Sequence, residues 1–273
     1  MLFTRREMLR VTTRGLAALG VAPGIALAQR QDHDFRFIVV NDLHYRDARC
    51  DDWLEGVVRG MRSHRADFCV LNGDLVENGQ GAQFAAVRRI FRELAIPIFV
   101  TIGNHDHRED DDRSAFEQAF PNSLNYHFAH KGCQFVAVDS TQGDEVFYTK
   151  IAQSTLDWLD ENLPQLDKNK PTVLLTHFPL GSGVWCRPRN APQVLTRFHD
   201  YNLRAVFNGH WHGFTHREFE DAQVVTNRCC SWWRANNDGT PEKGYFLCDV
   251  RGGEIERTFY EVKATPQSGR IAA

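Results

Sequence analysis

The amino-acid sequence predicts an α/β fold in which parallel β-strands carry helices on their faces. Apolar runs rich in β-formers alternate with amphipathic segments between residues 35 and 102, and several of these runs end in a short cluster containing Asp, Asn or His. A strand–helix–strand order requires crossover connections and therefore parallel pairing. Residues 223–262 instead contain closely spaced β-rich runs, which indicate antiparallel pairing near the end of the chain.

Individual elements follow from hydrophobic periodicity and turn residues. The turn at Lys131-Gly132 and the Arg251-Gly252-Gly253 sequence each predict a hairpin. No repeat or linker interrupts the pattern, so we expect one domain over residues 29–262 and a flexible tail at 263–273. Strands are expected at 35–40, 67–71, 96–102, 125–129, 133–139, 172–175, 203–207, 223–226, 244–250 and 254–262, and helices at 51–61, 84–94, 116–120, 156–163 and 194–201.

The beginning of the chain resembles an export signal. Positive charges that include Arg5 and Arg6 precede a short apolar stretch at 15–27, which ends in a small-residue cleavage pattern. Paired arginines resemble a twin-arginine signal, and the apolar stretch is too short and too rich in Gly and Ala to be a membrane span. We therefore expect the twin-arginine translocation machinery to export the protein, residues 1–28 to be removed as a signal peptide, and the mature protein to be periplasmic or secreted without a stable membrane anchor.

Charge and cysteine content exclude some functions. The 273 residues include 32 Lys and Arg against 35 Asp and Glu, and without residues 1–28 the net charge falls to about −6. This balance argues against a nucleic-acid or anionic-membrane surface, but not against a phosphorylated substrate, because a bound metal supplies local positive charge. Seven cysteines without a CxxC pair argue against a cysteine zinc site. Cys69, Cys133 and Cys248 are expected in the core, and the sequence defines no disulfide pairing.

Five polar clusters directly follow predicted strands, at the edge where open α/β sheets bind ligands. Asp42 and His44 are two residues apart, as are His210 and His212, and in an extended chain this spacing directs both side chains to one side. Carboxylates, imidazoles and an amide oxygen together suit divalent metals such as Mn, Fe or Zn. A single cluster is equally compatible with an ordinary polar loop, and the common position of all five favours a metal site. The remaining members are Asp74, Asn104, His105, Asp106 and His177.

The order of these clusters resembles that of the calcineurin-like metallophosphoesterase family over residues 38–213. The pattern consists of Asp42-x-His44, Gly73-Asp74, Gly103-Asn104-His105-Asp106, His177-x-Pro179 and Gly209-His210-x-His212. The resemblance implies a four-layer α/β/β/α sandwich of two mixed β-sheets flanked by helices. It also implies two divalent ions bridged by Asp74, one completed by Asp42, His44 and His212, and the other by Asn104, His177 and His210.

The same resemblance implies hydrolysis of a phosphate ester by attack of a metal-bound hydroxide on phosphorus. His105 would stabilise the developing charge or protonate the leaving oxygen. We expect a phosphodiesterase acting on small phosphorylated substrates. A phosphomonoesterase (a phosphatase or nucleotidase) stays open, and a non-catalytic scaffold on the same fold is a remote alternative.

The sequence leaves the functional roles of several residues near the clusters open. Phosphatase relatives carry an Asp where Glu77 stands, and cyclic-nucleotide phosphodiesterase relatives often have a second His where Phe178 stands, so the role of Glu77 and the cyclic-nucleotide assignment are open. The sequence does not define the oligomeric state. Candidates for supporting the site or touching substrate are Asp106, Arg108, Trp232 and Trp233.

Overall fold

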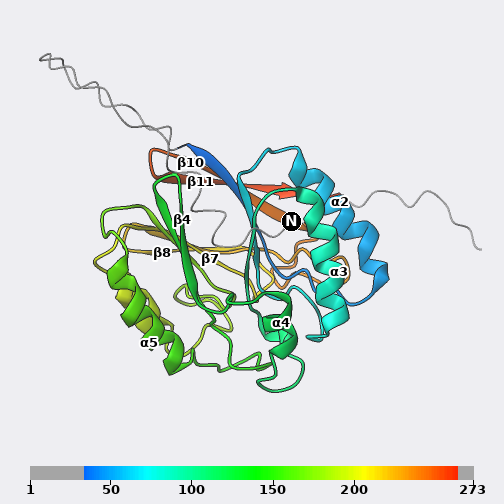
Figure 1. Cartoon of the computed structure of the whole chain (residues 1–273), viewed down its shortest axis with the longest axis horizontal. Helices are drawn as coiled ribbons and strands as arrows, with labels where there is room; N and C mark the ends of the chain where they lie inside the picture. Colours follow the sequence, from blue (N-terminus) through cyan, green and yellow to red (C-terminus); the bar gives the residue numbers. More distant parts are fainter. Residues whose placement is uncertain (1–33, 264–273) are drawn as a thin grey trace, which may run out of the picture.

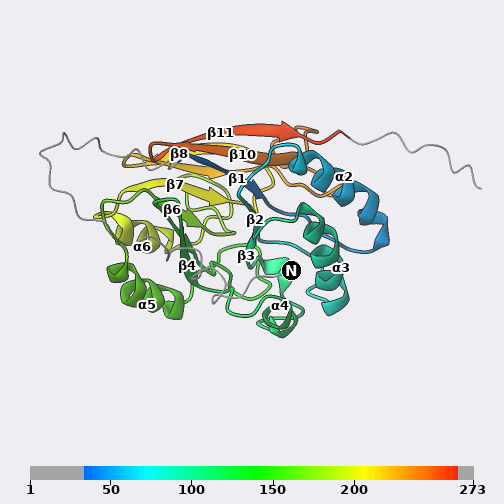
Figure 2. The ribbon, with the colours of Figure 1, turned by 45° about the horizontal axis from the view of Figure 1, so that its top comes forward.

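A computed structural model describes residues 34–263, which form two face-to-face β-sheets with helices on the outer face of each (Figure 1). The layers are clearest in Figure 2, where α2 (Asp51–Arg62) and α3 (Gly81–Phe91) lie beside one sheet and α5 (Gln153–Asn162) and α6 (Ala191–Leu195) beside the other. This arrangement confirms the predicted α/β/β/α sandwich. The expected signal peptide, residues 1–28, and nearly all of the expected tail lie outside the described residues.

The first sheet has five strands in the order β11-β10-β1-β2-β3. As predicted, its first three strands along the chain pair in parallel, and the last two form an antiparallel hairpin at the Gly252-Gly253 turn. Strand β10 also pairs antiparallel with β1, which makes the sheet mixed. The strands are β1 (Phe35–Val40), β2 (Phe68–Asn72), β3 (Ile98–Thr101), β10 (Gly244–Arg251) and β11 (Glu254–Glu261), and the helices beside them are α2 (Asp51–Arg62), α3 (Gly81–Phe91) and the shorter α4 (Ser114–Ala119).

The second sheet has six strands in the order β4-β5-β6-β7-β9-β8. Its four central strands are parallel, and β4 and β8 pair antiparallel at its two edges. The strands are β4 (Tyr126–His130), β5 (Cys133–Ala137), β6 (Thr172–Leu175), β7 (Leu203–Asn208), β8 (Thr215–Phe219) and β9 (Ala222–Thr226), and the helices are α5 (Gln153–Asn162) and α6 (Ala191–Leu195).

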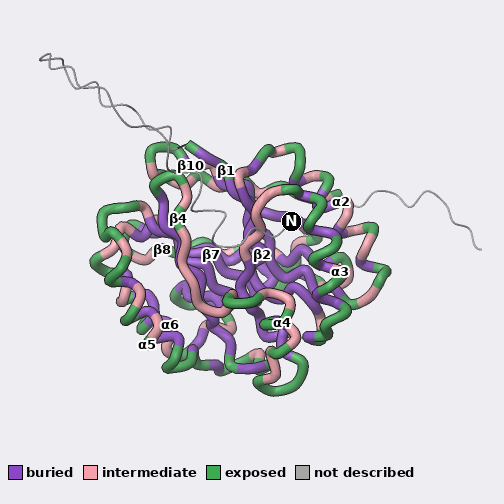
Figure 3. Tube along the Cα trace, in the orientation of Figure 1, coloured by how far each residue is buried: buried purple, intermediate pink, exposed green. Residues whose placement is uncertain are grey.

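Aromatic side chains fill the space between the two sheets. Phe37 stacks on Phe68 with ring centroids 5.2 Å apart, and it meets Phe135 of the other sheet edge-on at 5.3 Å. The next residue on β1, Ile38, points the opposite way and packs among residues of the helices. Because the central strands are buried on both faces, they read as continuous apolar runs, and Figure 3 shows this buried interior.

The differences from prediction lie in exposed or terminal segments. Strand β8 was not predicted, because its Thr-His-Arg-Glu-Phe sequence is largely exposed at a sheet edge and has no apolar face. The helix expected at 194–201 starts earlier, and α6 ends at Leu195 before a single 3₁₀ turn. Cys69, Cys133 and Cys248 are buried as expected, and all seven cysteines are free. Within residues 34–263 no helix is long and apolar enough to span a membrane.

Candidate metal centre

The carboxyl ends of strands from both sheets meet at one edge of the sandwich, and the five polar clusters lie there. Backbone hydrogen bonds continue from the strands into the loops, with Asp42 N donating to Gly73 O and His44 N donating to Asp74 O, both at 3.0 Å. Gly209 N donates to His177 O at 2.8 Å in the second sheet. These bonds fix the loop backbones, so the clustered side chains are positioned by the sheets themselves.

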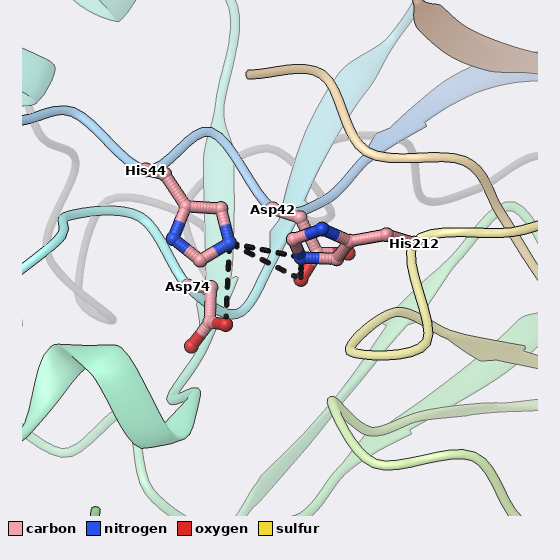
Figure 4. A group of neighbouring side chains, drawn as sticks. All are labelled: Asp42, His44, Asp74 and His212. Carbon is pink, nitrogen blue, oxygen red and sulfur yellow. Dashed lines mark hydrogen bonds and ion pairs between the residues drawn. The ribbon is translucent and has the colours of Figure 1, made fainter. Parts of the chain in front are cut away.

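Four buried side chains form the first group of possible ligands, Asp42, His44, Asp74 and His212 (Figure 4). Nε2 of His44 lies 2.9 Å from Nε2 of His212 and 3.5 Å from Oδ2 of Asp74. Nε2 of His212 lies 3.3 Å from Oδ1 of Asp42. Figure 4 shows these atoms converging on one point, which is the arrangement that a bound cation requires.

Asp74 also belongs to a second buried group, with His177 and His210. Oδ2 of Asp74 lies 3.2 Å from Nε2 of His177. Oδ1 of the buried Asn104 has no hydrogen-bond partner among the described residues, which suits an oxygen that would bind a cation. Asp74 is therefore the carboxylate that the two groups share.

Hydrogen bonds behind the imidazoles define which ring nitrogen is free to bind metal. Nδ1 of His44 lies 2.9 Å from Oε2 of Glu77, and Nδ1 of His177 lies 3.2 Å from the carbonyl of Asn72. Nε2 of His210 lies 3.0 Å from the carbonyl of Val146. Since these oxygens only accept, each of these ring nitrogens must donate, and the opposite nitrogen of each ring is the one that would bind a metal once it carries no proton.

The backbone of the ligand clusters departs from the extended conformation that their spacing predicted. Asp42 and His44 have φ of 54° and 47°, and His210 and His212 have φ of 65° and 48°. The expectation that an extended backbone directs both members of each pair to one side is therefore wrong, because the chain has left the strand and turned into the left-handed region. The side chains converge through this turn. Asp74, with φ 51°, shares it.

Two glycines permit close approach between the loops. A Cβ on Gly103 would lie 2.2 Å from both N and Oδ1 of Asp74, and a Cβ on Gly73 would lie 2.2 Å from Nδ1 of His177. Gly103 itself has an ordinary φ of −114°. It is therefore required by the space beside Asp74 and not by backbone conformation.

Buried carboxylates control the protonation of two imidazoles. Burial alone would lower the pKa of His177 and His212, but nearby carboxylates, chiefly Asp74 for His177 and Asp42 for His212, raise these pKa values to about 9 and about 10. Burial and the neighbouring His177 lower the pKa of His210 to about 4. Without metal at neutral pH, His177 and His212 are thus protonated, and their positive charges lie against the carboxylates of Asp74 and Asp42.

Metal binding at pH 7 is expected to release about two protons, because a metal-bound imidazole must lose the proton that His177 or His212 carries. Affinity should accordingly rise with pH up to about 9 to 10. Titration calorimetry in buffers of different ionisation enthalpy measures the number. His199→Gln is a matched control, since Glu220 raises the pKa of this exposed histidine far from the clusters. Metal uptake without proton release would contradict the protonated state of His177 and His212.

His105 lies beside the ligands and has its own support. Its backbone N–H donates to Oδ1 of Asp74 at 2.9 Å, and its Nδ1 lies 3.1 Å from the backbone carbonyl of Glu77. The side chain is 25% exposed, unlike the fully buried His44 and His177. The sequence left the role of Glu77 open. In the structure its carboxylate orients His44 and its backbone carbonyl orients His105. His44, Glu77 and His105 also form a third, smaller group of possible ligands.

The other residues that the sequence singled out range from buried contacts with the ligand loops to the exposed surface. Asp106 is buried, and its carboxylate accepts from Val76 N and Gly103 N, so it joins two loops. Trp233 donates from Nε1 to the carbonyl of His44 at 3.0 Å. Trp232 is 47% exposed. Arg108 is exposed and bonds to Asp112, and Phe178 stacks on His210 with centroids 3.9 Å apart.

The donor set fits two borderline divalent ions, with carboxylate, imidazole and amide atoms converging from both sheets. Sequence reasoning selected every residue of the two groups but missed Arg234, which bonds to Glu77, and Cys229, whose thiol contacts His212. Neither belongs to a strand-end cluster, so no local pattern marks them. Which of the selected residues bind metal stays a prediction.

The geometry defines a protein with a candidate dinuclear metal centre at the carboxyl edge of a two-sheet sandwich. The model of the calcineurin-like phosphoesterase family matches residues 35–214, and the chain belongs to this family.

Similar proteins include a probable cyclic nucleotide phosphodiesterase of a Synechococcus species, 28% identical over 57% of this chain and 62% of that protein. A glycerophosphodiester phosphodiesterase, GpdQ, of Enterobacter lignolyticus is 24% identical over 62% of this chain and 64% of its own length. The chain thus spans somewhat less than two thirds of these relatives. Among solved structures, a dimetal phosphatase of Danio rerio superposes with a TM-score of 0.65 at 16% identity, covering 84% of this chain and 99% of that one, which shows the shared fold.

Proposed function

We propose that this protein is a metal-dependent phosphodiesterase of small substrates. The observation that carries the proposal is the pair of buried ligand groups that share Asp74, with the partly exposed His105 beside them. Two ions held there would activate a water at neutral pH and stabilise charge on the attacking and leaving oxygens. Relatives named as phosphodiesterases support a diester substrate over a monoester.

The residues of the chain would divide this work. Asp42, Asp74 and the buried imidazoles would hold the ions and exclude bulk water, since Asp42, His44 and His177 are 0% exposed. His105 reaches the exposed side of the centre, where a substrate would lie. Its Nδ1 proton is held by the carbonyl of Glu77, so Nε2 is the atom that would meet the leaving oxygen or a phosphoryl oxygen.

Turnover of bis(4-nitrophenyl) phosphate is expected to exceed turnover of 4-nitrophenyl phosphate, measured as kcat/KM with Mn, Zn, Fe and Co in turn. Faster monoester turnover with every metal would favour the phosphomonoesterase alternative. Two bound metals without turnover of either ester would favour the non-catalytic scaffold. Both substrates release 4-nitrophenolate, so a difference in kcat/KM reflects whether the phosphate is a diester or a monoester.

A further inference from the structure

Arg234 follows the paired tryptophans in the loop after β9 and reaches the centre from outside the five clusters. Its Nε donates to Oε2 of Glu77 at 3.1 Å, and its Nη2 donates to Oε1 of the same carboxylate. Nη2 also lies 3.4 Å from Nε2 of His105. The guanidinium is thus adjacent to the one ring atom that the proposed function directs at the ester.

The loop holds this guanidinium in place. The neighbouring Trp233 is anchored by its hydrogen bond to the carbonyl of His44, and Cζ of Arg234 lies 4.9 Å from the Trp233 ring centroid. Arg46 lies over the same ring at 4.7 Å. Stacking on an indole and a two-point bond to Glu77 fix the plane of the guanidinium before any ligand arrives.

Arg234 still has hydrogen-bonding capacity to offer. Its side chain is 27% exposed, and Nη1 makes no hydrogen bond within residues 34–263. The negative charge of Glu77 is shared, because Oε2 also accepts from Nδ1 of His44. A planar donor with one free edge beside a metal centre is suited to an anionic phosphoryl oxygen.

We propose that Arg234 binds a non-bridging oxygen of the substrate phosphate next to His105, and so acts as a specificity-determining residue for phosphate esters. The proposal rests on the proposed function for the identity of the ligand. One oxygen can contact both Nε2 of His105 and the guanidinium, because the two groups are 3.4 Å apart. Arg234 would therefore act on binding of the ester together with His105, while the metal ligands remain untouched.

The test measures inorganic phosphate binding to the metal-loaded protein by calorimetry, which needs no turnover. Arg234→Gln should weaken phosphate binding about 10- to 100-fold, the range of a lost charge-assisted hydrogen bond. KM for bis(4-nitrophenyl) phosphate should rise by a similar factor, and metal content should stay unchanged. Arg234→Lys, which keeps the charge but loses the planar fork, should give an intermediate loss.

The matched control is Arg197→Gln. Arg197 also makes a two-point bond to a carboxylate, Asp160, at 2.8 Å for both contacts, and it is 23% exposed on the far helical surface. This variant should bind phosphate as the unmodified protein does. Melting temperatures of all variants verify that each is folded.

Two outcomes would overturn the proposal. Unchanged phosphate affinity in Arg234→Gln would show that the guanidinium does not touch the phosphate. Loss of metal from Arg234→Gln to the same degree as from Glu77→Gln would show that Arg234 only supports Glu77 and His44. If Arg234→Gln weakens phosphate binding but the unmodified protein hydrolyses no ester, the proposed function is wrong, and Arg234 is still supported as a phosphate-binding residue.

Discussion

Asp74→Asn is expected to remove most of the bound metal and to abolish measurable hydrolysis. Asp74 is the one carboxylate shared by the two ligand groups, and its Oδ2 lies 3.2 Å and 3.5 Å from ring nitrogens of His177 and His44. Asparagine is nearly isosteric with aspartate, and its amide oxygen can still accept from His105 N. The substitution therefore removes the negative charge and keeps the size and shape of the side chain. The loss should exceed the 10- to 100-fold typical of changing a residue behind a ligand.

Elemental analysis and kinetics on the same preparations measure this effect. Asp42→Asn is the internal comparison, because Asp42 belongs to the first group alone, and it should lose less metal and less activity. Asp160→Asn, on the exposed surface, should change neither. Full metal content in Asp74→Asn would exclude this residue as the bridge.

His105→Ala is expected to lower the rate roughly 10²- to 10⁴-fold while the metal content stays constant. The ring is held by the carbonyl of Glu77 and lies against His44 with centroids 4.8 Å apart, yet it is partly exposed toward the solvent side. The guanidinium of Arg234 beside Nε2 makes this position unfavourable for another cation. We therefore expect His105 to act on the substrate and not on a metal.

The dependence on leaving group separates two roles of His105. If it protonates the leaving oxygen, the loss should be smaller for an ester of nitrophenolate, which departs without a proton, than for an alkyl ester. An equal loss for both would assign His105 to electrostatic stabilisation of the phosphoryl group. A metal ion missing from His105→Ala would instead make His105 a ligand, as the third group of side chains allows.

The central strands and the strand-end clusters were predictable because they depend on local sequence. Buried parallel strands are continuous apolar runs, and the ends of neighbouring strands must meet at one edge whatever the loops do. This brought Asp42, Asp74 and His177 together without knowledge of the loops.

Supporting contacts made by long-range packing were not predictable. Glu77 and Arg234 are separated by 157 residues, and Val146 reaches His210 across 64 residues, so no periodicity or motif reports either contact. The two-residue spacing of the paired ligands gave a wrong prediction of backbone conformation, again because contacts between distant residues determine the loops. It predicts convergence only for an extended backbone, whereas Asp42 and His212 lie in turns that tertiary hydrogen bonds impose. Strand β8 was missed because an exposed edge strand needs no apolar face.

The left-handed backbone of five metal-ligand candidates has an evolutionary consequence. Each of them has a φ between 47° and 65°, a conformation that costs a residue with a Cβ about 1–2 kcal/mol relative to glycine. Selection for backbone stability alone would favour glycine at these positions, so the side-chain chemistry of Asp and His offsets this cost. A lineage released from catalysis should lose these positions early and gain stability by doing so. The five residues are Asp42, His44, Asp74, His210 and His212.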